Sequence, residues 1–131
     1  MNIKSFMMEV VGDTKEIKIE RFPEPIVIEA ISETENDRLK RVHTTKRRSK
    51  SGNTVKELDT DKYGDALLAR CVKTPDLQDA QLQAYYKTEG SATDTLKAML
   101  LAGEYANLTK EVLELNGFNE SEEELKEDVK E

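Results

Sequence analysis

Apolar residues alternate with polar ones between residues 16 and 31, on both sides of a break that holds Pro23 and Pro25. The apolar positions of this alternation are Ile17, Ile19, Ile26, Ile28 and Ala30. A period of two predicts two strands joined by a turn, with one buried face. Because an isolated hairpin is marginally stable in water, we expect its apolar face to rest on helices or on another subunit.

Two short segments mark the starts of helices. In "SETE" at 32–35 and "SATD" at 91–94, a serine precedes an acid by three residues, which is the spacing of a capping box. We expect the first helix to run through the basic residues that follow and to fade into a polar loop around Gly52. The second helix should carry Leu96, Met99 and Leu100.

The segment "DTDKYGDALLARCV" from Asp59 predicts a helix that belongs to the core. Tyr63, Leu67 and Cys71 follow one another at steps of four residues and so share one helical face. This helix should end at "KTP", and Pro75 should open a further helical stretch that reaches Gly90 with looser periodicity.

The stretch "KAMLLAGEYANLTKEVLELNGF" at 97–118 predicts two helices with a corner between them. Gly103 is a poor residue for a helix interior, so we expect the break there. The second helix has one apolar stripe, formed by Tyr105, Leu108, Val112 and Leu115. Its end should be a Schellman motif, with Gly117 in the left-handed conformation and Phe118 folded back on Leu113.

The length of 131 residues fits one domain with a modest core. The pattern predicts an α+β fold that is mainly α, with an N-terminal β-hairpin followed by four or five short helices. We expect an N-terminal arm over residues 1–14 and a single domain over 15–118 that contains a mobile basic loop at about 46–58. An acidic, disordered tail should follow over 119–131.

Charge is distributed unevenly along the chain. The net charge is −7, and the tail alone carries seven acids and two bases, whereas residues 38–50 hold seven bases and no acid. Four arginines of this basic segment are candidates for electrostatic contacts: Arg38, Arg41, Arg47 and Arg48. The segment has no aromatic residue for base stacking, so a solvated face or an acidic protein partner is favoured, and a nucleic-acid-binding regulator is the alternative.

Few residues offer chemistry. Cys71 and His43 are the only cysteine and the only histidine, so neither a disulfide framework nor a Cys/His zinc site is predicted. Cys71 lies on an apolar helix face and should behave as a small hydrophobic residue. The carboxylates fall in the tail or on polar faces, and no glycine loop has the spacing for phosphate binding. We therefore predict no catalytic residue, cofactor or metal, and expect a cytoplasmic protein without a membrane-spanning segment.

Two groups of apolar residues are candidates for protein contacts. One is the helical stripe over the predicted corner, formed by Leu96, Met99, Leu100, Leu101, Tyr105 and Leu108. At helical spacing such a stripe is more often core than docking surface. The other is the N-terminal segment "IKSFMMEVV", in which Phe6 and Met7 are the candidates for contact between chains.

The second half of the chain resembles a known family. The segments "DKYGDALLARCVKTPDLQDAQLQAYY" and "LKAMLLAGEYANLTKEVLELNGF" are similar to the XkdN-like tail assembly chaperones of tailed phages and defective prophages. The family usually has a proline before Gly-Glu-Tyr, where this chain has Ala102. The matching residues are structural, so the resemblance brings no active site.

The resemblance implies a non-enzymatic protein that binds the tape measure protein and keeps it soluble until the tail tube polymerises around it. It implies action in the cytoplasm of the bacterial host and absence from the mature virion. The expected partners are the tape measure protein, the tail tube protein and further copies of the same chain, with no membrane and no nucleic acid.

Overall fold

The computed structural model describes residues 1–118, so the acidic tail predicted to be disordered lies outside the described residues. Along the chain follow η1 (a 3₁₀-helix, Ile3–Phe6), β1 (Thr14–Ile17), β2 (Ile26–Glu29), α1 (Glu33–Val42), β3 (Thr44–Arg48), β4 (Thr54–Leu58), α2 (Thr60–Cys71), β5 (Val72–Thr74), α3 (Ala80–Tyr86), α4 (Ala92–Met99) and α5 (Ala102–Leu115). The predicted α+β class, with an N-terminal hairpin and helices after it, is confirmed.

The predicted hairpin forms the first sheet. β1 and β2 pair antiparallel with Ile17 opposite Ile26, and the four isoleucines of the alternation are buried, whereas Ala30 is half-buried. A third strand, β5, pairs antiparallel with the other side of β2. It has three residues and follows α2 directly, which is too short for any periodic signal in the sequence.

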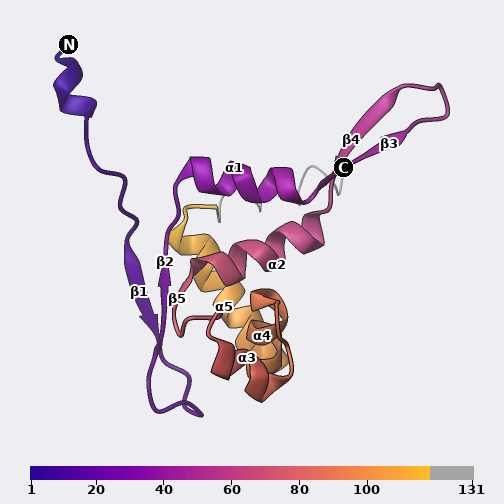
Figure 1. Ribbon diagram of the computed structural model, residues 1–131. Coiled ribbons are helices and arrows are strands. Elements are labelled where there is room, and N and C mark those ends of the chain that lie inside the picture. The colour runs from indigo at the N-terminus through magenta and orange to yellow at the C-terminus, as the bar shows by residue number, and fades with distance from the viewer. Residues whose placement is uncertain (119–131) are drawn as a thin grey trace.

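The basic segment folds differently from the expectation. α1 ends at Val42, and the expected loop over residues 46–58 is a second antiparallel hairpin, β3 and β4, which pair from Thr44 opposite Leu58 to Arg48 opposite Thr54. Threonine favours a strand over a helix, and Gly52, with φ of 89°, supplies the turn. The hairpin projects from one end of the molecule, opposite the N-terminal arm (Figure 1).

Side-chain caps set the starts of the helices. Ser32 and Ser91 accept hydrogen bonds from the backbone N–H groups three residues on, at 3.2 and 3.1 Å, as predicted. Asp59 caps α2 in the same way at 3.1 Å. α3 begins later than expected, because Asp79 and not Pro75 provides its cap, with the N–H of Leu82 at 2.9 Å.

The corner between α4 and α5 is confirmed, but it lies two residues before Gly103. Leu100 and Leu101 have extended backbone, and Gly103 belongs to the first turn of α5. The Schellman end is also confirmed. Gly117 has φ of 78°, and the N–H of Phe118 donates to the carbonyl of Leu113 at 2.9 Å.

The core is aliphatic and lies between the first sheet and the helices. α2 packs against α1, α4 and α5, and the sheet packs against α2 and α5. The buried hydrophobic residues are Ile17, Ile19, Ile26, Ile28, Leu67, Leu68, Cys71, Val72, Leu77, Leu96, Met99, Leu108 and Val112. The fold therefore uses residues from most elements and leaves the N-terminal arm and the second hairpin outside the core.

Candidate protein-interaction site

The corner between α4 and α5 is held by a hydrogen-bond cluster that reaches across the chain. Glu104 accepts from the backbone N–H of Leu101 at 2.8 Å and from Nε of Arg21 at 3.0 Å. Nη2 of Arg21 also donates to the carbonyl of Met99 at 2.9 Å. Arg21 follows β1, so this cluster ties the loop of the first hairpin to the corner.

The same cluster explains the acidity of Glu104. The hydrogen bond from Arg21, and then that from the N–H of Leu101, lower the pKa of Glu104 from 4.5 to about 2. The carboxylate therefore stays charged at neutral pH and lies in the first turn of α5, where the helix dipole favours a negative charge. The backbone at the corner is thereby fixed.

Leu101 occupies the N-cap position of α5 and points its side chain into solvent, with 63% of its surface exposed. Leucine has no acceptor for the N–H groups of the first turn, whereas Ser, Thr, Asp or Asn there stabilises a helix by about 0.5–2 kcal/mol relative to an apolar residue. The chain thus keeps a large apolar side chain at a position where both solvation and local stability favour a polar one.

The predicted apolar stripe divides into buried and accessible residues. Leu96, Met99 and Leu108 lie in the core and cannot reach a partner in this conformation. Leu100 and Tyr105 are half-buried. The contact role predicted for the stripe stays a prediction, and in this structure Leu101 is its most exposed member.

Tyr105 faces away from the corner toward α2. Its hydroxyl donates to Oδ1 of Asp65 at 2.7 Å, and Nζ of Lys97 donates to Oδ2 of the same carboxylate at 2.6 Å. Burial raises the pKa of the Tyr105 phenol, and the bond to Asp65 raises it further. Tyr105 is thus a neutral donor that joins α5 to α2.

The first eleven residues of the N-terminal arm carry the largest group of exposed apolar side chains in residues 1–118. Seven of them have between 59% and 101% of their surface exposed: Met1, Ile3, Phe6, Met7, Met8, Val10 and Val11. The arm leaves the body beside β1 (Figure 1). Phe6 and Met7, the predicted contact residues, therefore lie in solvent.

A groove of about 590 Å³ opens on the helical side of the body. Leu58 and Thr60 line it at the base of the second hairpin, and α2 and α5 form its walls. The groove is lined by the side chains of Tyr63, Leu67, Tyr105, Leu113 and Phe118 and by the backbone of Gly64. The groove is thus mainly apolar, with Lys40, Asp61 and Asp65 among its polar lining residues.

Three of the four arginines predicted to make electrostatic contacts have acidic partners in the chain. Arg38 pairs with Glu35 at 2.7 Å, Arg41 with Asp37, and Arg47 with Glu57 at 3.0 Å.

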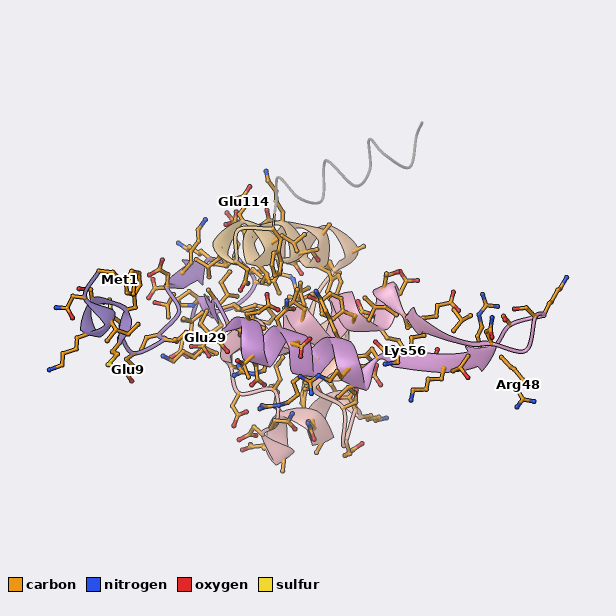
Figure 2. All side chains as sticks on the ribbon, turned by 90° about the horizontal axis from the view of Figure 1, so that it is seen from above. Met1, Glu9, Glu29, Arg48, Lys56 and Glu114 are labelled. Atoms are coloured by element: carbon orange, nitrogen blue, oxygen red, sulfur yellow. The ribbon has the colours of Figure 1, made fainter. Side chains whose placement is uncertain are left out.

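Arg48 lies at the far end of the second hairpin and points outward (Figure 2). Ion pairs within the chain reduce the positive potential that a phosphate backbone would meet. They weigh against the nucleic-acid alternative, which stays a prediction.

The described residues offer no centre for catalysis. Cys71 is fully buried, and burial raises the pKa of its thiol, as expected for a residue that acts as a small hydrophobic side chain. Within residues 1–118, no three His, Cys, Asp or Glu residues group in a way that could hold a metal ion. No helix in that range is long and apolar enough to cross a membrane.

Sequence reasoning missed part of this site. Arg21 and Glu104 are 83 residues apart, so no local pattern could have paired them. The exposure of Leu101 could have been suspected, because an apolar residue stands directly before the acid-containing first turn "AGE", where a cap is expected. Gly64 could also have been noticed in the sequence, because a glycine in the middle of an otherwise well-formed helix can have a packing or functional reason.

Comparison with known proteins places these features in context. The family model described as phage XkdN-like tail assembly chaperone protein matches residues 3–130. An uncharacterized protein YqbN of Bacillus subtilis (strain 168) is 30% identical over 106 residues, which are 81% of this chain and 71% of that protein.

The phage-like element PBSX protein XkdN of the same organism is 28% identical over 106 residues, which cover 81% and 72% of the two chains. The crystal structure of the protein YqbN superposes with a TM-score of 0.74 at 25% identity, over 90% of this chain and 98% of that one. The sequence similarity to YqbN and XkdN, and the similarity in fold to YqbN, therefore extend over most of each of the compared chains.

Proposed function

Because the chain belongs to the XkdN-like family of phage tail assembly chaperones, which are non-enzymatic, we propose that it binds the tape measure protein and keeps it soluble during tail assembly. A protein that keeps an aggregation-prone partner in solution needs accessible apolar surface and a net charge well away from zero. The exposed apolar side chains of residues 1–118 and the net charge of −7 meet both needs.

The observation that carries this proposal is the exposed leucine at the corner between α4 and α5. Leu101 is held on a backbone that Arg21 and Glu104 fix, and its side chain has no function in the core. We propose that the client lies across Leu101 and the accessible edge of Leu100. A rigid apolar contact of this kind binds without an ordering cost on the side of the chaperone.

The proposal also assigns roles to the other parts of the chain. We propose that residues 1–14 act as an arm for self-association, that 15–118 form the single folded domain, and that the acidic residues 119–131 keep complexes hydrated and contact the tail tube protein. The protein would act in the cytoplasm of the bacterial host and would be absent from the mature virion.

The test replaces Leu101 by Asp and measures how much tape measure protein stays soluble on co-expression. Asp is a favoured N-cap residue, so Leu101→Asp should leave thermal stability equal to wild type or higher while it removes the apolar contact. The matched control is Val42→Asp, because Val42 is also an exposed apolar residue, at 70%, and lies on α1 instead of the corner.

We expect Leu101→Asp to lose most of the soluble client and Val42→Asp to retain it. If the two variants retain equal amounts of client and both fold, the corner is not the contact surface. Equal loss in both variants would likewise contradict the assignment, because it would show a general sensitivity to added charge.

A further inference from the structure

The groove and the N-terminal arm are two apolar surfaces that the described part of one chain leaves exposed. The arm leaves the body at the end opposite the β3–β4 hairpin (Figure 1), and Met1 and Arg48 lie toward opposite ends of the molecule (Figure 2). The groove begins at the base of that hairpin, at Leu58 and Thr60. An arm that projects from the body of its own chain can meet the groove of another.

We propose that the N-terminal arm of one copy docks in the groove of a second copy, so that the chains associate head to tail. This inference deepens the self-association proposed above and does not depend on the identity of the client. Repeated, such a contact closes into a ring or grows into an open chain, depending on the rotation between neighbours.

Gly64 is the first observation that points to an occupant. It lies inside α2 and lines the groove, and a Cβ built on it would meet nothing within 4 Å. The fold of one chain therefore does not require a glycine there, although glycine weakens the interior of a helix. What distinguishes Gly64 from Gly103, the other helical glycine with open space beside it, is that Gly64 lines the groove, where it lets a second chain approach the backbone of α2 closely.

The area of the arm is the second observation. Its seven exposed apolar side chains offer on the order of 100 Å² each, hence on the order of 700 Å² together. A stable protein–protein interface buries about 800 Å² on each partner, so the arm has to bury nearly all of this area, partly in the groove and partly on the surface around it. Residues 1–11 reach at most roughly 36 Å when extended, so the arm is long enough to cross the groove and not only touch its rim.

The charges of the two surfaces also correspond. The arm carries one base and one acid, Lys4 and Glu9. The groove has the exposed acid Asp61 near one end, and Lys40 also lines it. An arm laid along the groove can pair Lys4 with Asp61 and Glu9 with Lys40.

The base of the arm is fixed, which favours a defined direction of docking. Gly12 lies against Ala30 so closely that a Cβ on it would be 1.9 Å from the Ala30 carbonyl oxygen. Next to it, the carbonyl of Asp13 accepts the N–H of Ala30 at 2.9 Å. The arm therefore starts from a rigid point of the first sheet.

The experiment blocks each surface separately in the full-length protein and measures association by analytical ultracentrifugation. Gly64→Leu fills the groove, and since leucine favours helix over glycine, the fold should be retained. Its matched control is Gly103→Leu, because Gly103 is also a helical glycine with open space beside it but does not line the groove. The double variant Phe6→Asp with Met7→Asp removes apolar surface from the arm.

We expect wild type and Gly103→Leu to associate with increasing concentration, and the groove variant and the arm variant to sediment as monomers. The decisive step is to mix the two monomeric variants. One then supplies an intact arm and the other an intact groove, so the mixture should form one-to-one dimers and nothing larger.

Several results would overturn the proposal. Wild type that stays monomeric at all concentrations excludes arm exchange between copies and leaves the groove to another occupant. Association of the Gly64→Leu variant equal to that of wild type excludes the groove, and a mixture that stays monomeric excludes the pairing of arm with groove. None of these outcomes bears on client solubility, which is measured separately by the Leu101→Asp test.

Discussion

Replacing Leu96 by Ala tests whether α4 and α5 pack as described. Leu96 and Leu101 lie five residues apart, and both were candidates for protein contact on the basis of spacing. In the structure the side chain of Leu96 has 0% of its surface exposed, and that of Leu101 has 63%. The same change to Ala at both positions therefore compares a core residue with a surface residue in one part of the fold.

The expected magnitudes follow from these exposures. A fully buried Leu→Ala change costs about 2–5 kcal/mol, because transfer free energy is lost and a cavity remains. At Leu101 only about a third of the side chain leaves water on folding, so the cost should stay below about 1 kcal/mol. For a chain of 131 residues, a loss of about 3 kcal/mol lowers Tm by roughly 10 °C.

The measurement is urea denaturation followed by the helical circular dichroism signal, with a thermal scan as a second probe. Leu96→Ala should shift the midpoint far more than Leu101→Ala, with an unchanged slope in both. If Leu96→Ala cost less than about 1 kcal/mol, or if the two variants lost equal stability, the placement of Leu96 in the core would be refuted.

Three further predictions follow from particular contacts. The pKa of Glu104 is about 2 in the folded chain and 4.5 in the unfolded one, so its contribution to stability is present above pH 4.5 and is lost as pH falls toward 2. The variant Glu104→Gln should therefore show a smaller fall of Tm over that pH range. A Tm profile equal to that of wild type would contradict the cluster with Arg21. Gly117→Ala forces a side chain into the left-handed region and should lower the free energy of unfolding, measured in urea, by about 1–2 kcal/mol. Gly103→Ala should not lower it, because Gly103 is helical and has open space beside it. Equal effects of the two changes would argue against the Schellman end. Cys71 is buried with a raised pKa, so a thiol reagent should modify it only as fast as the protein unfolds, and rapid labelling of the native protein would show that α2 is not packed as described.

The helices and the first hairpin could be predicted because their signals are local. Ser32 and Ser91 carry their capping acceptors in their own side chains, and the Schellman end needs only Gly117 and the residue after it. The alternation around Ile17 and Ile26 also lies within one short stretch. Where the same few residues both carry the signal and form the contact, sequence reasoning was sufficient.

The second hairpin could not be predicted, because it has no apolar face. β3 and β4 are mostly exposed and present polar side chains in both directions, so the period of two that marks a strand is absent from them. Their pairing rests on backbone hydrogen bonds, β-branched residues and the ion pair of Arg47 with Glu57. Residues 38–50 hold seven bases and few apolar residues, so their pattern predicted a helix face followed by a loop and gave no indication of a strand.

The candidate site was found only in part. The pattern of residues 97–118 indicated a corner, but the exact break depends on Glu104 accepting the N–H of Leu101, and on Arg21 from a distant segment. The same pattern could not separate Leu101 from Leu96, because both lie on or next to one apolar stripe. Separating them requires the positions of the elements that pack against α4, among them α2 and α3.

The most direct test of the central claim is co-expression with the tape measure protein encoded by the same genetic element. The complex is purified through a tag on the present chain, treated with nuclease, and analysed by light scattering. The account predicts that the tape measure protein becomes soluble and elutes with several copies of this chain. If the tape measure protein stays insoluble and this chain elutes alone, the proposed chaperone function is contradicted.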